Sequence, residues 1–207
     1  MARDTQPIVK MSRREGYALH PKAHKALVKR PTPPGQHGNG RMGGRQRTSQ
    51  YAMQLREKQK VKRLYGLLER QFSKLMKEAN RQQGQSGQVL LQFLEQRADN
   101  VLYRAGFAPS RRAARQLMSH GHFMLNDVRV DIPSIRLKPG DTLVVRPQSA
   151  QTEYFKKLDD VSPAPSATPA WLKVDRKKVQ VAVTALPTRD DAETDINEQL
   201  IVEYYSR

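Results

Sequence analysis

The clearest hydrophobic pattern in the chain lies within its first half. Five apolar side chains recur there every three or four residues: Leu64, Leu68, Phe72, Leu75 and Ala79. This spacing places them on one face of a helix, whereas residues 56–63 before them are polar and basic. We therefore predict a helix over residues 49–81, basic in its first half and apolar along one face in its second. Gly66 is its weak point, because glycine has a low helix propensity.

Three shorter helices follow. The sequence Gly-Gln-Ser-Gly at 84–87 ends the long helix. The hydrophobic positions after it predict helices around residues 89–94, 95–106 and 111–121. Gly106 and Gly121 can adopt the left-handed backbone that ends a helix, and Ser110 is a candidate N-cap.

A period of two replaces the helical period beyond residue 121. Residues 122–131 alternate between apolar and polar around Asn126–Asp127, a pair that suits a tight hairpin turn. Lys-Pro-Gly-Asp at 138–141 is a second predicted turn, and a strand follows at 142–146. With the two helices before them, these elements predict a compact unit over residues 95–146.

The two ends of the chain are less regular. Residues 1–48 show little periodicity. Residues 148–170 are rich in Pro, Ala and Ser, which is typical of a linker, with room for a short helix near residues 154–158. The last apolar segments fit either short strands or a loop pair that folds back on the body: 171–174, 179–183 and 196–207. The predicted fold class is α+β, with a mostly helical N-terminal lobe.

Positive charge is concentrated in the first two-fifths of the chain. The sequence has 37 Lys and Arg against 20 Asp and Glu, a formal net charge of +17. Residues 1–81 hold 20 of these basic residues and five of the acidic ones, whereas residues 82–207 hold 17 and 15. Such an excess favours a polyanionic partner: nucleic acid, an anionic membrane or an acidic protein. A segment this basic repels itself unless a polyanion neutralises it, so we interpret residues 1–81 as a major RNA-contact surface.

A segment dense in proline and glycine lies inside this basic part. At residues 29–47, glycines let the backbone approach a phosphate closely, and Arg41, Arg45 and Arg47 lie among them. From this run alone, a flexible basic tail is an equally good interpretation.

The compact unit also carries candidate cations. Arg104 lies near the end of one predicted helix, while Arg111 and Arg115 share a face of the next. His120 and His122 precede the hairpin. Arginine suits phosphate because its planar fork donates two hydrogen bonds at once, although a solvated charged face is the alternative. A DNA-binding helix-turn-helix is less favoured, because no base-edge readout is recognisable and the hairpin suits a reader of RNA shape.

Catalytic and metal chemistry has little support in the sequence. The absence of cysteine excludes disulfides, thiol catalysis and Cys-ligated zinc. His20 and His24 are four residues apart, but Pro21 lies between them and no glutamate completes a metal-binding helix motif. We therefore predict no enzyme, no metal and no cofactor.

The acidic residues fit structural roles. The acidic cluster near the C-terminus fits a solvated loop: Asp190, Asp191, Glu193 and Asp195. Asp99 is expected to pair with Arg97, with Arg104 or with a helix N-terminus. No segment approaches the ~18 consecutive apolar residues of a membrane span, and the first residues lack a signal core, so we expect a soluble intracellular protein without membrane contact.

Several motifs in this order resemble one family, the bacterial-type small-subunit ribosomal protein S-four. The motifs are SRREG at 12–16, PPGQHG at 33–38, YAMQLREKQKVKRLYGLLERQF at 51–72, DNVLYRAGFAPSRRAARQLMSHGH at 99–122 and DINEQLIVEYYSR at 195–207. The chain resembles the cysteine-free form, whereas some members carry four cysteines and a zinc. It departs from the family at Ala98, where Leu is usual, and at Asp127, where the hairpin usually has Gly.

The resemblance implies an α+β protein with an S-four-type RNA-binding module, two helices plus a small antiparallel sheet, inserted in a helical lobe. The implied domains are a basic Gly/Pro-rich extension and loop at 1–48, a basic helical lobe at 49–94 completed by residues 170–207, and the module at 95–160.

The resemblance also implies a function and partners. The protein would be a structural constituent of the small ribosomal subunit in the cytoplasm. It would bind the 5′ domain of the small-subunit ribosomal RNA first and nucleate its assembly. It would also line the channel through which messenger RNA enters, and contact protein S-five at an interface tied to decoding accuracy. The candidate RNA-binding residues are Arg13, Arg14, Gln36, His37, Arg41, Arg45, Arg47, Gln54, Arg56, Lys58, Lys60, Lys62, Arg63, Arg104, Ser110, Arg111, Arg115 and His120.

Two other functions remain open at this level. An RNA-modifying enzyme with the same module, such as a pseudouridine synthase, would need a catalytic domain beyond residues 95–146. A stress protein that acts on stalled ribosomal subunits would not need the long basic N-terminal lobe.

Overall fold

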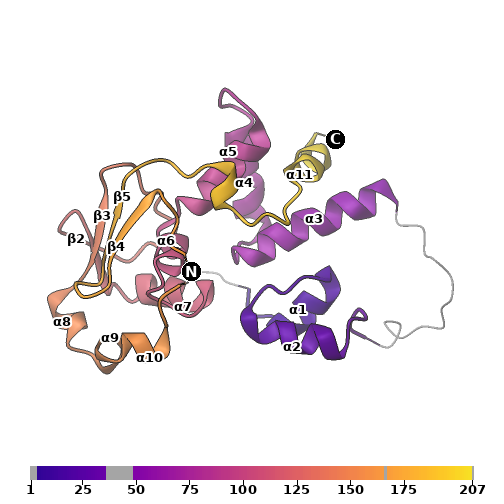
Figure 1. Cartoon of the computed structure of the whole chain (residues 1–207). Helices are drawn as coiled ribbons and strands as arrows, with labels where there is room; N and C mark the ends of the chain where they lie inside the picture. Colours follow the sequence, from indigo (N-terminus) through magenta and orange to yellow (C-terminus); the bar gives the residue numbers. More distant parts are fainter. Residues whose placement is uncertain (1–3, 36–48, 166, 207) are drawn as a thin grey trace. The chain divides into compact units, whose positions relative to one another are not determined.

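The computed structural model describes residues 4–35, 49–165 and 167–206, and it divides the chain into two compact units (Figure 1). The first unit comprises Met1–Leu90 and Thr194–Arg207, and the second comprises Leu91–Glu193. Helices make up the first unit, and a sheet with helices makes up the second. The predicted α+β class is therefore confirmed.

The helices of the first unit are α1 (Ile8–Glu15), α2 (Pro21–Lys29), α3 (Gln50–Leu64), α4 (Glu69–Ala79) and α11 (Glu198–Tyr205), and α5 (Ser86–Glu95) contains the boundary between the units. The sequence did not predict α1 and α2, because residues 1–48 show little periodicity. Local caps define them instead. Gly16 ends α1 with a left-handed φ of 65°. His20 Nδ1 accepts a hydrogen bond from Lys22 N at 3.0 Å, and Pro21 occupies the first position of α2.

The predicted long helix is two helices. α3 ends at Leu64, α4 begins at Glu69, and Gly66 between them has a left-handed φ of 64°. Gly66 is therefore a break, as its low helix propensity indicated. The predicted apolar face of α4 is confirmed at Phe72 and Ala79, which are both 0% exposed, whereas Leu75 is half-buried.

The C-terminal residues form α11, not the strands or loops that we expected. The Asn197 side chain accepts a hydrogen bond from Gln199 N at 3.2 Å and caps the helix. Ile201 is fully buried, and the Tyr204 ring lies 5.8 Å from the Tyr51 ring of α3. A helix of eight residues has only about two turns, which is too short for its period to stand out in the sequence.

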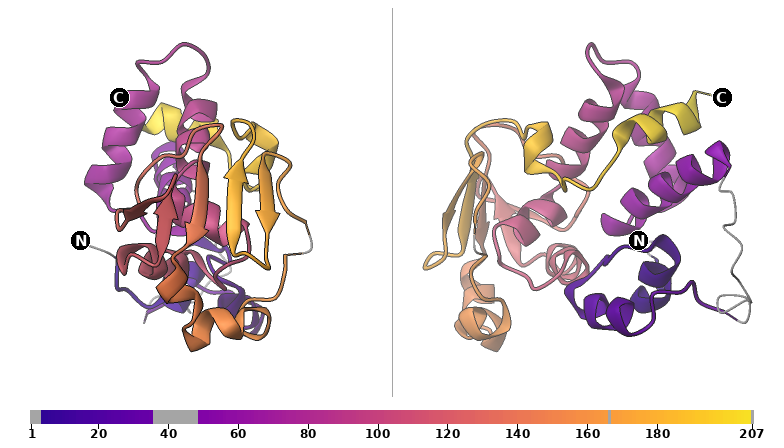
Figure 2. Two further views of the ribbon diagram at one scale, coloured as in Figure 1. Left: turned by 90° about the vertical axis from the view of Figure 1, so that its left-hand side faces the viewer. Right: turned by 45° about the vertical axis from the view of Figure 1, so that its right-hand side comes forward.

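The second unit contains a five-stranded antiparallel sheet with the strand order β2-β1-β3-β5-β4 (Figure 2). Its strands are β1 (Phe123–Leu125), β2 (Val128–Val130), β3 (Thr142–Val145), β4 (Leu172–Asp175) and β5 (Gln180–Val183). Its helices are α6 (Ala98–Arg104), α7 (Arg111–Ser119), α8 (Pro147–Ala150), α9 (Glu153–Lys156) and α10 (Leu158–Val161), with a 3-10 turn, η2 (Arg189–Asp191). α6 and α7 share a core with the sheet, in which Val101, Met118 and Leu143 are fully buried.

The predicted caps and turns of this unit are confirmed. Ser110 Oγ accepts a hydrogen bond from the first turn of α7 at 3.2 Å. Gly106 and Gly121 follow α6 and α7 with φ of 75° and 68°. Asn126 and Asp127 form the β1–β2 turn with φ of 46° and 66°, the left-handed backbone that a two-residue hairpin requires.

The second unit includes β4 and β5, so the boundary between the two units differs from the one that we expected. We assigned residues 170–207 to the helical lobe, but β5 pairs with β3, with Leu143 opposite Val181. Val181 and Val183 alternate with half-buried residues and point into the core of the second unit. Only residues from Thr194 onward belong to the first unit. The cause is long-range strand pairing, which a period of two does not reveal.

Candidate RNA interface

An acid–arginine cluster lies at the junction of α6 and α7. Asp99 accepts two hydrogen bonds from Arg97, at 3.0 and 2.9 Å, and one from Arg115 Nε at 2.8 Å. Glu95 accepts two from Arg104, at 3.0 and 2.9 Å. The side chains of Asp99 and Glu95 are only 5% and 0% exposed. Buried, charge-assisted hydrogen bonds of this kind fix the orientation of the guanidinium groups.

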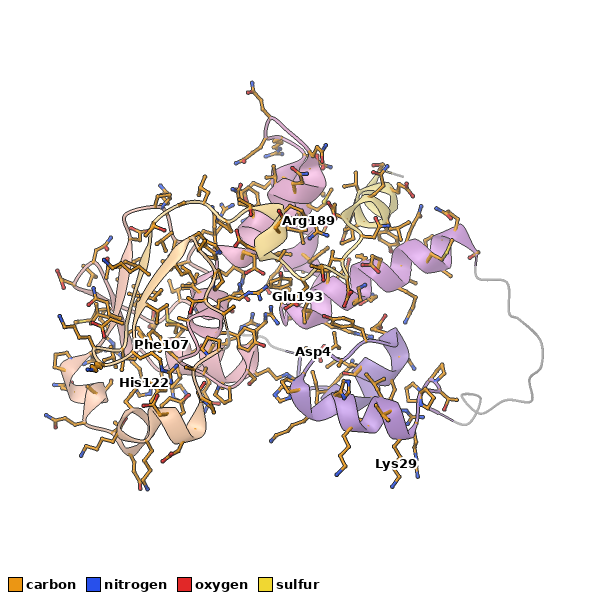
Figure 3. All side chains as sticks on the ribbon, viewed as in Figure 1. Asp4, Lys29, Phe107, His122, Arg189 and Glu193 are labelled. Atoms are coloured by element: carbon orange, nitrogen blue, oxygen red, sulfur yellow. The ribbon has the colours of Figure 1, made fainter. Side chains whose placement is uncertain are left out.

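Arg111 of α7 joins the two helices. Its Nε donates to Asn100 Oδ1 at 2.8 Å, and its Nη2 donates to Glu193 Oε1 at 3.1 Å. Its guanidinium also lies 4.5 Å from the centre of the Tyr103 ring. Glu193, labelled in Figure 3, is thus an ion-pair partner and not the solvated residue that we expected. Stacking and two bonded edges hold Arg111 in one orientation.

The sequence located this cluster but not its internal pairing. Arg104, Arg111 and Arg115 lie together as predicted, yet carboxylates hold all three, and their side chains are 18%, 12% and 17% exposed. Asp99 pairs with Arg97 as one prediction had it, while Arg104 binds Glu95. A phosphate can therefore approach only the outer edges of these guanidinium groups.

The outward face of α7 is more open. Its exposed residues are Arg112, Gln116 and Ser119, followed by His120. Ser110 caps the helix, which gives it a structural role. His122 is half-buried, with Nδ1 3.0 Å from Ser149 Oγ. Burial lowers the pKa of His122, and His120 and Arg146 lower it further.

In the first unit, Glu15 of α1 engages two cations of α3 that we predicted to bind RNA. The Glu15 side chain is fully buried, and it accepts hydrogen bonds from Arg56 Nη1, at 3.3 Å, and from Arg63 Nη1. Burial raises the pKa of Glu15, while the two arginines act in the opposite direction. Arg63 is 13% exposed and Arg56 43%, so Arg56 keeps a free surface.

Glu69 of α4 binds two more of these cations. Lys58 Nζ and Lys62 Nζ donate to its carboxylate at 2.9 and 3.0 Å, and Tyr205 Oη donates at 2.8 Å. Burial alone would raise the pKa of Glu69, but these three hydrogen bonds outweigh it and lower the pKa to about 2. Burial and the hydrogen bond to Glu69 raise the pKa of Tyr205.

Two predicted RNA ligands are buried inside the first unit. Gln54 is 3% exposed and donates to Glu203 Oε2 at 2.8 Å. Lys58 is also 3% exposed, with Nζ 4.4 Å from the centre of the Tyr204 ring. The expectation that they face RNA is therefore corrected, because α11 covers them. Lys60 stays 13% exposed and binds Glu57 Oε1 at 2.8 Å and the Asp195 carbonyl at 2.6 Å.

The α1–α2 pair carries two cations that we predicted to bind RNA, Arg13 and Arg14, and others that the sequence reasoning missed. Arg13 donates to the Thr32 carbonyl at 3.0 Å, whereas Arg14 is exposed. Further exposed cations are Lys10 on α1 and Lys22, Lys25 and Lys29 on α2. Figure 3 shows Lys29 pointing away from the ribbon. The spacing of the α2 lysines by three and four residues could have identified this face.

Five candidate RNA-binding residues lie outside the described residues: Gln36, His37, Arg41, Arg45 and Arg47.

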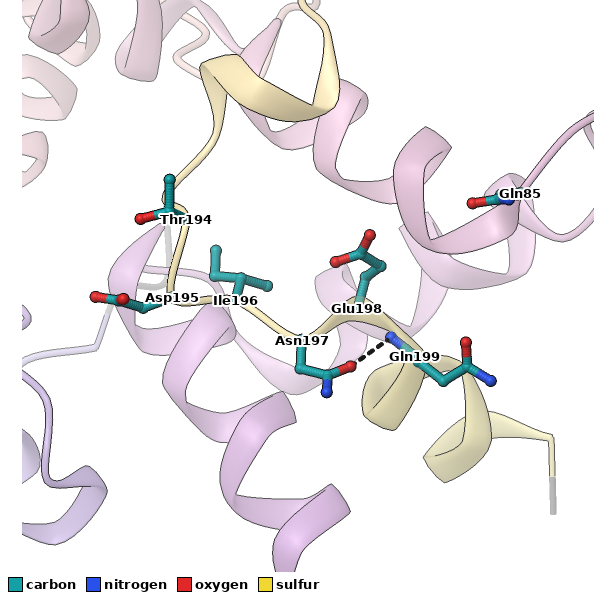
Figure 4. Close-up of a pocket in the computed structure, with 7 residues that line it drawn as sticks. All are labelled: Gln85, Thr194, Asp195, Ile196, Asn197, Glu198 and Gln199. Carbon is teal, nitrogen blue, oxygen red and sulfur yellow. Dashed lines mark hydrogen bonds between the residues drawn. The ribbon is translucent and has the colours of Figure 1, made fainter.

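A polar hollow lies beside the segment that leads into α11 (Figure 4). It is lined by Gln85, Thr194, Asp195, Ile196, Asn197, Glu198 and Gln199. Two of these side chains are acidic and none is basic, so the hollow differs in charge from the α1–α2 face.

Neither a metal centre nor a membrane span emerges from the part of the chain that the structure describes. In residues 4–35, 49–165 and 167–206, no three His, Asp or Glu side chains are grouped so that they could hold a metal ion. No helix among these residues has the length and apolar character to cross a membrane.

Comparison with known proteins places the chain among ribosomal proteins. Residues 3–95 match the ribosomal protein S4/S9 N-terminal domain, and residues 96–143 match the S4 domain. The small ribosomal subunit protein uS4 of Chloroflexus aurantiacus is 49% identical over 208 residues, and the full length of both chains is covered. The uS4A protein of Symbiobacterium thermophilum is 47% identical over 213 residues, and the uS4 protein of Roseiflexus sp. (strain RS-1) is 48% identical over 208, again over full lengths.

Proposed function

Because the chain belongs to the family of the small ribosomal subunit protein uS4, we propose that it works as a structural constituent of that subunit by binding ribosomal RNA. Its place of work is then the ribosome in the cytoplasm. The relatives are named as ribosomal subunit proteins, and catalysis is no part of the proposal.

Unneutralised positive charge on α1 and α2 carries this proposal. Lys10, Arg14, Lys22, Lys25 and Lys29 are exposed, and no carboxylate of the described residues forms an ion pair with them. Glu15, the acidic residue of α1, is buried against α3. Exposed cations without internal partners can neutralise phosphates, and the release of counterions then drives RNA binding.

Substitution of the α2 lysines tests the proposal. We expect the triple variant Lys22→Gln, Lys25→Gln, Lys29→Gln to bind a transcript of the 5′ domain of small-subunit ribosomal RNA at least tenfold more weakly, since each lysine lost removes roughly one phosphate contact. Filter binding at one fixed salt concentration measures this.

The matched control removes three exposed lysines of the second unit: Lys156→Gln, Lys177→Gln and Lys178→Gln. It changes the net charge equally, so a general charge effect would weaken both variants alike. An α2 variant that binds no more weakly than this control contradicts the proposed role of α2.

The finer roles are also proposals. The resemblance supports early binding to the 5′ domain and nucleation of its assembly. It also supports contact with messenger RNA where it enters the subunit, through Arg41, Arg45 and Arg47. Replacing these three arginines by Gln should reduce the crosslinking of bound message to this chain in purified subunits, and unchanged crosslinking would refute the contact.

A contact with protein S-five is proposed for the segment around the polar hollow. Carboxylates such as Asp195 and Glu198 suit a basic protein neighbour better than RNA, because RNA is itself anionic. Asp195→Lys should then weaken the capture of purified S-five. Capture at the wild-type level would argue against this surface.

A further inference from the structure

The outward face of α4 carries a row of cations that form no ion pair with any of the described residues. Arg70, Lys74 and Lys77 recur at intervals of four and three residues, so they share one face of the helix, and all three are exposed. Phe72 and Met76 lie on the opposite face and are fully buried. The row therefore points away from the core of the first unit. Its first and third members are about 10 Å apart along the helix axis.

Carboxylates of the described residues form no ion pair with this row, since Arg70, Lys74 and Lys77 have none. Glu69 of the same helix binds Lys58 and Lys62 of α3 instead. A solvated helix face usually alternates its charges, because like charges at four-residue spacing destabilise a helix. The uncompensated row on α4 is thus suited to an external polyanion.

α3 shows the opposite arrangement. Arg56, Lys58, Lys60, Lys62 and Arg63 each form an ion pair with a carboxylate of the first unit. The sequence pattern assigned RNA binding to these α3 cations and a core role to α4. The ion pairs reverse part of this assignment, because the cations of α4 remain available and most of those of α3 do not.

The surroundings of the row indicate which polyanion fits. α4 exposes no aromatic side chain, since Phe72 is its one aromatic residue and is buried, so it offers no platform on which an unpaired base could stack. Lysine-rich faces without exposed apolar residues are also poor protein interfaces. Exposed polar residues continue the surface beyond the helix, at Arg81, Gln82 and Gln83.

We propose that Arg70, Lys74 and Lys77 bind the sugar–phosphate backbone of a double-helical RNA segment, as a contact separate from the α1–α2 face. This inference rests on the proposed function, since it concerns how the chain binds ribosomal RNA. Double-helical RNA is recognised largely through its backbone and shape, which is what a row of long cationic side chains can contact.

The test uses the full chain with Arg70→Gln, Lys74→Gln and Lys77→Gln. Glutamine is a good helix former, and all three positions are exposed, so an unchanged circular dichroism spectrum and melting temperature should confirm the fold. With the 5′-domain transcript, we expect the slope of log affinity against log salt to become shallower by roughly 2–3. Hydroxyl-radical footprinting should show lost protection at backbone positions in paired RNA, while other protections remain.

The control is again Lys156→Gln, Lys177→Gln, Lys178→Gln, which should leave that footprint intact. An α4 variant with the slope and footprint of this control overturns the inference and leaves the proposed function standing. Protection lost only at unpaired nucleotides overturns the choice of double-helical RNA. A wild-type chain that does not bind the transcript overturns the proposed function and this inference together.

Discussion

Asp99 accepts hydrogen bonds from two arginines, and the packing of α6 against α7 depends on it. It pairs with Arg97, which is 7% exposed, and with Arg115. Removing one partner of a buried ion pair leaves an uncompensated charge in the interior. The residues that the sequence suggested as RNA ligands therefore also hold the second unit together.

We expect Asp99→Asn to lower the free energy of unfolding of the second unit by about 3–5 kcal/mol. Urea unfolding followed by the fluorescence of Trp171, which is buried in that unit, measures the loss. Asp159→Asn is the control, because Asp159 is 88% exposed in its pair with Arg176 and such a pair contributes about 0–1 kcal/mol. Equal losses in the two variants would refute the structural role of Asp99.

Glu69 makes the first unit sensitive to acid. Its pKa is about 2 in the fold against an ordinary value of 4.5. A carboxylate with a lowered pKa stabilises the fold above its ordinary pKa, and this stability is lost as the pH falls from about 4.5 towards 2. Glu69→Gln should therefore flatten the pH dependence of the protection factors for amide hydrogen exchange in α3 and α4 between pH 5 and 2. Asp195→Asn in the same unit is the control, because the Asp195 side chain is exposed, and a Glu69 variant as acid-sensitive as wild type would disprove the role of Glu69.

At the scale of elements, the β1–β2 hairpin holds a non-glycine residue, Asp127, in a left-handed backbone conformation. Asp127 has a φ of 66°, which costs an L-residue free energy that glycine avoids. We expect Asp127→Gly to raise the free energy of unfolding by roughly 0.5 kcal/mol, as read from Trp171 fluorescence in urea.

The neighbouring turn residue provides the contrast. Asn126 also has a positive φ, but its side chain donates to Asp141 Oδ1 and accepts from Thr142 N, both at 2.9 Å. Asn126→Gly should therefore lower the stability by about 1 kcal/mol. If Asp127→Gly lowered the free energy of unfolding as much as Asn126→Gly, backbone strain at residue 127 would not limit the stability of the hairpin.

The sequence predicted elements where local signals decide them. Ser110, Gly106 and Gly121 bound α6 and α7 as expected, and Asn126–Asp127 forms the expected turn. It failed where burial depends on distant partners. α1 has few apolar positions of its own, and Val181 of β5 belongs to the second unit only because it faces Leu143 of β3. Such pairings are not encoded in a local period.

The sequence likewise predicted only part of the candidate site. Charge and spacing found Arg104, Arg111 and Arg115, which do lie together. They did not reveal that α11 buries Lys58 or that Glu15 binds Arg63, since those contacts join residues far apart in the chain. The basic residues of α3 thus stabilise the fold of the first unit through ion pairs, a role that their spacing in the sequence did not reveal.

For the whole molecule, the distribution of charge decides which surfaces can bind RNA more than the net charge of +17 does. Internal carboxylates neutralise most cations of α3 and of the α6–α7 junction. The exposed cations that form no ion pair with a described residue include Lys10 and Arg14 of α1, the three lysines of α2 and the row on the outward face of α4. We propose that these surfaces bind ribosomal RNA by neutralising phosphates.

The salt dependence of binding between the full chain and a 5′-domain transcript tests this claim most directly. Each phosphate neutralised contributes roughly 0.7–0.9 to the slope of log affinity against log salt, so at least six contacts predict a slope of about −4 or steeper. A slope shallower than about −2, or no binding at moderate salt, would contradict the account.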